Sequence, residues 1–304
     1  MAKVIEAEGS AKVWWHLMRP HTLTASFAPV LLGTAIAAVG GFDLNFLLFL
    51  AMLVASLLIQ AATNMFNEYY DFKRGLDNED SVGIGGTIVR HGVAPKTIMQ
   101  IALSFYFIAM LLGIYICASS SWWLVAIGLV CMLIGYLYTG GPYPIAYSPF
   151  GELVSGAVMG MGIVLISFFI QANTVTLDAV LISVPSMILV GAIMLSNNIR
   201  DIVGDTEGGR KTMAILVGRH HAITILAAFF IVSFTWVVGL ILTGHLTWLA
   251  LIVFLCVKKP IQAVKLFRAK QLPLEVMPAM GMTAKTNTMF VFLLAIALGL
   301  SLLF

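Results

Sequence analysis

Long apolar stretches alternate with short polar connections along almost the whole chain. A helix that crosses a bilayer needs roughly 20 apolar residues. Nine stretches approach or reach that length, at 22–40, 46–66, 97–117, 122–140, 151–171, 179–198, 221–243, 246–257 and 286–304. The eighth is short, with room to extend past Lys258. The pattern predicts an all-α polytopic membrane protein with nine transmembrane helices, built as a single domain over residues 1–304.

Composition favours a membrane protein over a large soluble one. Hydrophobic residues make up 60% of the chain and charged residues 10%, with a mean hydropathy of +0.99. A soluble domain is nearer to half apolar and a quarter charged. The first 19 residues lack the apolar core of a secretory signal peptide. The three cysteines lie far apart in apolar stretches and the histidines are scattered, so neither a disulfide nor a Cys or His metal site is expected.

The basic residues all fall on one side of the predicted membrane. With nine spans, the N-terminal arm (about 1–20) and the loops after even-numbered spans share a side, and they contain all 17 Lys and Arg residues. The positive-inside rule places that side in the cytoplasm and the C-terminus outside. We therefore expect a multi-pass plasma-membrane protein with its N-terminus in the cytoplasm. The basic segment 258–285 is expected to lie along the anionic inner surface.

Two polar clusters end the second and sixth spans. Asn67 and Asp71 are four residues apart, as are Asn197, Asp201 and Asp205. In a helix, this spacing puts each set on one face. Carboxylate and amide oxygens on one face suit Mg²⁺, which binds few carboxylates together with phosphate oxygens and water. Polar helix ends in water are the alternative, which the repetition of the pattern makes less attractive.

Both clusters open glycine-rich loops on the predicted cytoplasmic side, at about 67–95 and 199–219. Glycine lets a backbone approach an anion or bend over a cavity. A third polar island, residues 136–152, contains no Lys or Arg, and its tyrosines are candidates for a substrate pocket. An interfacial aromatic belt is the alternative there, especially for Tyr147. Glu152 begins the fifth span, where a helix N-terminus favours an acid.

Two acidic faces beside Arg and Lys at a membrane surface indicate a diphosphate bridged by Mg²⁺. The metal would stabilise the leaving diphosphate as an allylic C–O bond breaks. Tyrosine faces could stabilise the resulting cation, and an electron-rich aromatic carbon would attack it. A transporter of a phosphorylated or lipid-linked solute is the alternative from another class. Transporters, however, place ionisable groups nearer mid-membrane, whereas these acids lie at span ends.

These residues resemble the UbiA superfamily of intramembrane aromatic prenyltransferases. The resemblance runs from about Trp15 onward and is carried by Asn67–Asp71 with Asp77, Tyr138–Pro142, Asn198–Asp205 and Gly209–Thr212. It implies nine transmembrane helices around a central cavity, capped by two cytoplasmic loops. Within the superfamily, the chain is most similar to enzymes that transfer a polyprenyl group to 1,4-dihydroxy-2-naphthoate in menaquinone biosynthesis. Acceptors such as 4-hydroxybenzoate or homogentisate remain open.

The resemblance also implies the cofactor, the partners and the site. Mg²⁺, polyprenyl diphosphate and an aromatic acceptor are expected within a lipid bilayer, and no nucleic acid. The catalytic and metal-binding acids would be Asp71, Asp77, Asp201 and Asp205, with Asn67 as a further metal ligand. The diphosphate would bind Arg19, Lys73, Arg90 and Lys211. The substrate pocket would include Asn64, Tyr136, Tyr138, Tyr143, Asn197 and Asn198.

Two positions depart from the superfamily pattern. Gly75 stands where relatives commonly have an Asp four residues after the equivalent of Asp71, so we expect the helix to end at Gly75 and Asp77 to take that role. Tyr143 follows Gly-Gly-Pro where many relatives have a Lys. A basic contact to the diphosphate must then come from elsewhere, and the four basic residues named above are the candidates.

Overall fold

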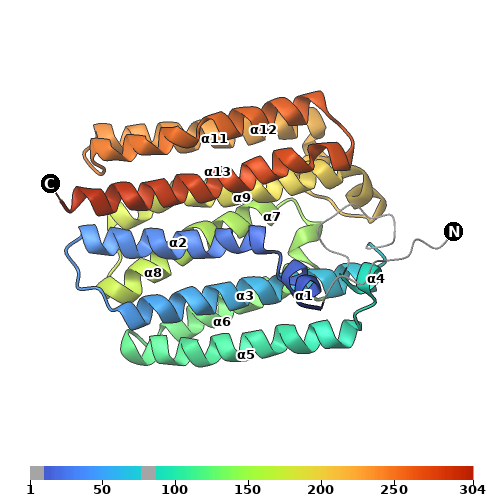
Figure 1. The fold of residues 1–304 in the computed structure, drawn as a ribbon, viewed down its shortest axis with the longest axis horizontal. Coiled ribbons are helices and arrows are strands. Elements are labelled where there is room, and N and C mark those ends of the chain that lie inside the picture. The colour runs from blue at the N-terminus through green and yellow to red at the C-terminus, as the bar shows by residue number, and fades with distance from the viewer. Residues whose placement is uncertain (1–9, 77–86, 304) are drawn as a thin grey trace.

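The computed structural model describes residues 10–76 and 87–303, and every regular element within them is helical (Figure 1). The α-helices are α1 (Ser10–Met18), α2 (Pro20–Val39), α3 (Phe46–Lys73), α4 (Thr87–His91), α5 (Pro95–Ser119), α6 (Leu124–Leu137), α7 (Gly151–Ser155), α8 (Ile163–Ala172), α9 (Leu177–Glu207), α10 (Met213–Val217), α11 (Arg219–Leu242), α12 (Lys258–Ala269) and α13 (Pro273–Ser301). The other helical segments are η1 (Ile145–Tyr147), η2 (Gly156–Gly162) and η3 (Trp248–Cys256).

Seven helices within the described ranges are long and apolar enough to cross a membrane: α2, α3, α5, the continuous α7–η2–α8, α9, α11 and α13. The all-helical membrane class is confirmed, and the count of nine long spans is too high. The expected fourth span is the 14-residue α6. The expected eighth is the 3₁₀ segment η3, which continues through Val257 into α12. A 3₁₀ helix rises about 2.0 Å per residue against about 1.5 Å in an α-helix, so a short segment reaches further.

The segment expected to lie along the membrane surface divides into two helices. Residues 258–269 form α12, and residues 273–285 are the first half of α13, a continuous helix with Pro278 inside it. Val276, Ala279 and Thr283 are buried there, and α13 packs against α2 and α9. The expectation was wrong for this half because those small and apolar side chains form a face that the bundle buries.

Glycines let the fifth span approach α9 closely. A Cβ added to Gly156 would lie 2.4 Å from the carbonyl oxygen of Met187, and one on Gly160 would lie 2.6 Å from its Cα. Small residues four apart allow such approaches in membrane bundles. The approach coincides with the π-helical turn η2, which inserts an extra residue per turn into the span. This close glycine contact holds α9, which carries the second polar cluster, against the fifth span.

The bundle brings the two polar clusters to the same end. In Figure 1, α1 lies at one end of the elongated bundle and the last turn of α13 at the other. The C-terminal turns of α3 and α9, which carry Asp71 and Asp205, lie at the α1 end. We call this the acidic end. Its two helices arrive there in the same direction, as expected from their even-numbered places in the order of spans.

The close helix contact predicts the effect of one added methyl group. Gly160→Ala should lower the free energy of unfolding by about 1–3 kcal/mol, because its Cβ meets backbone atoms of α9 that cannot rotate away. Gly239→Ala in α11 is the matched control, since a Cβ there has no described atom within 4 Å and alanine favours a helix by up to about 1 kcal/mol. Thermal unfolding in detergent measures both, and equal midpoints would contradict the close-packing account.

Candidate active site at the acidic end

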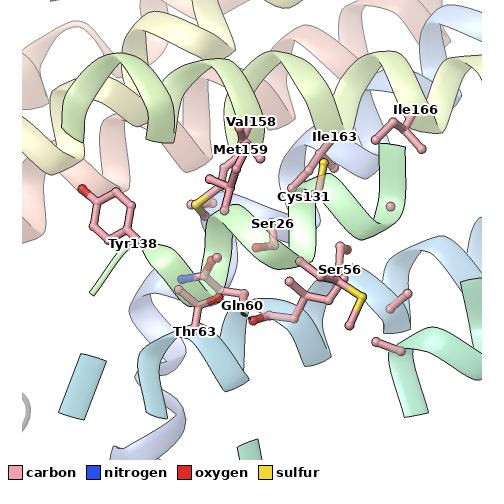
Figure 2. Close-up of a pocket in the computed structure, with 18 of the residues that line it drawn as sticks. Ser26, Ser56, Gln60, Thr63, Cys131, Tyr138, Val158, Met159, Ile163 and Ile166 are labelled. Carbon is pink, nitrogen blue, oxygen red and sulfur yellow. Dashed lines mark hydrogen bonds between the residues drawn. The ribbon is translucent and has the colours of Figure 1, made fainter. Parts of the chain in front are cut away.

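A cavity of about 310 Å³ runs inside the bundle from the acidic end almost to the opposite end, where Met52, Cys117 and Leu124 line it. Its wall is mostly apolar and is formed by α2, α3, α5, α6, the fifth span and α9. In Figure 2, Ser56, Gln60 and Thr63 of α3 face Met159 and Ile163 of the fifth span. Polar groups gather where the cavity meets the acidic end: Arg19, Asn64, Asn67, Tyr138 and Asn197. An apolar cavity with a polar mouth fits a molecule with a charged head and an apolar tail.

Arg210 joins the two polar clusters. Its Nη2 donates to Oδ1 of Asp71 in α3 at 2.7 Å, and its Nη1 donates to Oδ1 of Asp205 in α9 at 3.0 Å. Asp71 is 20% exposed and Asp205 7%. Gly209, with φ +73°, turns the chain back after α9, so that the Arg210 amide donates to the Asp205 carbonyl. Burial lowers the pKa of Arg210, but the Asp71 and Asp205 carboxylates outweigh it and raise that pKa above its usual value.

A second arginine fastens the polar loop after α6 to the end of α3. The Arg74 guanidinium donates to the carbonyls of Thr139 and Gly141, and the Thr139 hydroxyl donates to Oδ1 of Asn67 at 2.6 Å. The guanidinium carbons of Arg74 and Arg210 lie 5.3 and 5.2 Å from the Tyr147 ring centroid, within cation–π range. Tyr147 therefore packs against both arginines of this site.

Arg19 reaches the mouth of the cavity from the corner between α1 and α2. Its Nη2 lies 3.5 Å from Oε2 of Glu68, whose side chain is 1% exposed and whose Oε1 accepts the Ile88 amide. Asn64 donates to the Met18 carbonyl at 3.0 Å and to the Thr22 hydroxyl at 2.8 Å. These bonds hold the corner against α3, so Asn64 supports Arg19 as well as lining the cavity.

Some of the remaining predicted residues in and beside α6 and α9 line the cavity, and the others bond to neighbouring side chains. Asn197 and Tyr138 line the cavity. Asn198 instead donates to the buried Glu152 at 2.9 Å. Tyr136 is hydrogen-bonded to Tyr70 at 2.5 Å. Asp201 forms a two-pronged ion pair with its neighbour Arg200, with both N–O distances at 2.6 Å, so its oxygens are not part of the Arg210 bridge.

Three of the predicted basic contacts lie outside the bridge. Lys73, Arg90 and Lys211 have exposed side chains, and Lys73 Nζ lies 6.0 Å from the Tyr69 ring. Arg19 alone of the four expected residues lines the cavity. Arg74 and Arg210 were missed, although both stand in the motifs. Their neighbours Lys73 and Lys211 carry the same charge, and the sequence does not show which of each pair turns inward.

Two further predicted residues have different outcomes. Tyr143 is corrected: it is 91% exposed and outside the cavity, because the Gly140–Pro142 turn projects it outward while the Ala146 amide returns to the Tyr138 carbonyl. Asp77 lies outside the described residues. The expected end of the helix is confirmed, since α3 stops at Lys73 and Gly75 has φ +73°.

The oxygen donors at the bridge fit a hard divalent cation. Asp71 and Asp205 present carboxylates from two helices, and Asn67 lies one helical turn before Asp71. Oδ2 of Asp205 is buried and has no hydrogen-bond partner among the described residues. Over the same part of the chain, no three His, Cys, Asp or Glu side chains form a metal cluster. A cation here would therefore need further oxygens from a ligand or water.

A family model and the similar proteins of known name agree on one family. The UbiA prenyltransferase family model matches residues 26–275. The chain is 61% identical to the 1,4-dihydroxy-2-naphthoate octaprenyltransferase of Bacillus subtilis over 296 residues, covering 97% of this chain and 95% of that protein. It is 32% identical to the protein of the same name from Mycobacterium tuberculosis over 205 residues, covering 67% and 70%.

Solved structures share the fold. A UbiA homolog from Archaeoglobus fulgidus bound to GPP and Mg²⁺ has a TM-score of 0.65 at 14% identity, over 93% of this chain and 99% of that one. A digeranylgeranylglyceryl phosphate synthase has a TM-score of 0.64 at 15% identity, over 95% and 98%. The family expected from the two polar clusters is confirmed: the chain belongs to the UbiA prenyltransferase family.

Proposed function

We propose that this protein transfers a polyprenyl group from polyprenyl diphosphate to 1,4-dihydroxy-2-naphthoate, releasing diphosphate and CO₂ and giving demethylmenaquinol. The observation that carries the proposal is the 61% identity, over nearly the full length of both chains, to an enzyme named for this acceptor. The apolar cavity with its polar mouth supports it, because it separates a place for the tail from a place for the diphosphate.

The prenyl chain would lie along the apolar wall, with its diphosphate among Arg19, Asn67, Asp71, Asp205 and Arg210. Asn67, Asp71 and Asp205 would hold Mg²⁺, with Asp77 and Asp201 as further ligands. When bound there, Mg²⁺ would neutralise charge on the diphosphate and so make it a better leaving group. Arg19 and Arg210 add positive charge in a partly buried site, where each contact is worth more than in water.

The reaction then forms one carbon–carbon bond. The allylic C–O bond breaks and its electron pair leaves with the diphosphate. A ring carbon of the naphthoate gives an electron pair to the allylic cation, and loss of its carboxylate as CO₂ restores the aromatic ring. Tyr138 and Asn197 lie where the polar mouth meets the apolar wall, so they are placed to face the reacting carbons. The Tyr138 ring would stabilise the cation.

We further propose that the acidic end faces the cytoplasm of a plasma-membrane protein. All 17 Lys and Arg residues fall in the predicted cytoplasmic segments. The positive-inside rule states that loops rich in Lys and Arg stay in the cytoplasm. With this orientation, diphosphate is released on the cytoplasmic side.

Purified protein in detergent should prefer one acceptor. With one prenyl diphosphate and Mg²⁺, we expect turnover with 1,4-dihydroxy-2-naphthoate to exceed that with 4-hydroxybenzoate or homogentisate by at least about a hundredfold, as expected where buried polar groups select a substrate. Release of CO₂ and of prenylated product should match one to one. Faster turnover with either other acceptor would contradict the assigned substrate.

Loss of a bridging acid should abolish turnover. Asp71→Asn or Asp205→Asn should each lower kcat by at least about a hundredfold, because each removes one charge that would hold the metal against the diphosphate. Asp178→Asn is the control, since this acid pairs with His245 away from the cavity. Wild-type turnover should stop in excess chelator and return with Mg²⁺. Full activity in chelator would contradict a metal-dependent reaction.

The same assay separates Asp77 from its neighbours. Asp77→Asn should lower turnover and raise the Mg²⁺ concentration needed for half-maximal rate far more than Asp80→Asn does. Both substitutions keep side-chain shape and remove one charge. Equal, mild effects would reduce the first cluster to Asn67 and Asp71.

The orientation predicts the side of the C-terminus. A reporter that works only in the cytoplasm should be silent when it is fused after residue 304, and a reporter that works only outside should be active. The same reporters fused after residue 93 should give the opposite pair of signals. A cytoplasmic signal from the C-terminal fusion would show that an even number of segments crosses the membrane.

A further inference from the structure

The Arg210 bridge places a cation where a metal would also bind. The guanidinium donates to Oδ1 of Asp71 at 2.7 Å and to Oδ1 of Asp205 at 3.0 Å. The Arg210 side chain is only 14% exposed. Mg²⁺ binds carboxylate oxygens at about 2.0–2.1 Å and requires nearly ideal octahedral geometry. A metal bound to both carboxylates would compete with the guanidinium for their Oδ1 atoms, and a metal on the unpartnered Oδ2 of Asp205 would lie close enough to the guanidinium for the two positive charges to repel.

The two carboxylates need a cation more than ordinary surface acids do. Asp71 and Asp205 both lie in the last turn of a helix, where the unpaired carbonyls make the helix end negative. Without a positive partner, the two acids and the two helix ends would repel one another. Arg210 removes this repulsion, which links the positions of α3 and α9.

Arg210 also keeps donors that the carboxylates do not use. Its Nε is buried and has no hydrogen-bond partner among the residues the structure describes. A guanidinium has five N–H donors in a planar fork that matches a phosphate as well as it matches a carboxylate. A diphosphate arriving with its metal offers new acceptors to the fork at the moment the metal takes the carboxylates.

We propose that Arg210 is an exchange residue: it neutralises Asp71 and Asp205 until a metal–diphosphate complex enters, and then transfers its hydrogen bonds from the carboxylates to the diphosphate. This proposal rests on the proposed function. It makes binding of metal and diphosphate mutually dependent, because metal alone must displace Arg210 without giving it a new partner. Free metal is thereby kept from occupying the site without substrate.

The test measures binding, without turnover. Mn²⁺ binding to purified protein, with and without inorganic pyrophosphate, is followed by calorimetry or by the Mn²⁺ spin signal. Arg210→Gln should bind Mn²⁺ alone about tenfold more tightly than wild type, and should bind pyrophosphate in the presence of Mn²⁺ about tenfold more weakly. Arg210→Lys should shift both affinities in the same directions by less, because lysine keeps the charge and loses the fork.

Lys270→Gln is the matched control. It also removes one positive charge, from an exposed pair with Glu275, and should leave both affinities unchanged. Thermal unfolding identifies a variant that fails to fold; if Arg210→Gln does, the opposite shifts in Arg210→Lys decide. Metal and pyrophosphate affinities that fall together, or an unchanged metal affinity, would make Arg210 a structural bridge and overturn the exchange. Wild-type protein that binds no pyrophosphate with Mn²⁺ would instead contradict the proposed function.

Discussion

Two carboxylates at the negative ends of two helices require a cation between them, and the acidic end is arranged around that requirement. Asp71 lies in the last turn of α3 and Asp205 in the last turn of α9. Each therefore adds negative charge to a helix end that is already negative. Arg210 supplies the positive charge and joins the two helices through one side chain. This placement suits an enzyme that acts on a diphosphate. The two acids need a positive partner both without substrate, when Arg210 supplies it, and with substrate, when a metal bound to the diphosphate could supply it.

The bilayer explains why the chemistry lies at an end of the bundle and not in its middle. An ionised side chain deep in lipid has no water to solvate it, so charged residues gather where spans end. The proposed substrate is divided in the same way, with a charged head and a long apolar tail. A cavity that is polar at Arg19 and Asn67 and apolar toward Ile166 matches both. The glycine contacts of the fifth span with α9 and the packing of α3 on α5 hold the two walls of this cavity.

Sequence patterns predicted the all-helical membrane class and the meeting of the two clusters, because apolar length and the order of spans are properties of the chain alone, although the count of nine long spans was too high. They did not predict the inner structure of two spans. The 3₁₀ segment η3 and the π-turn η2 depend on neighbouring helices that pack against them. They also missed Glu68, which reads as one more acid of the first cluster; it lies about 100° around the helix from Asn67 and turns toward Arg19 and the Ile88 amide.

Which basic residues reach the site is decided by backbone turns. Tyr143 follows the Gly-Gly-Pro turn and points outward, so the loop after α6 brings no positive charge to the site. Positive charge comes instead from Arg74, which follows α3, and from Arg210, which follows the Gly209 turn after α9. Both guanidiniums lie against the Tyr147 ring, so one aromatic residue helps to place them. The positive charge beside the two acids thus comes from the loops after α3 and α9, and the loop after α6 contributes backbone carbonyls that Arg74 binds.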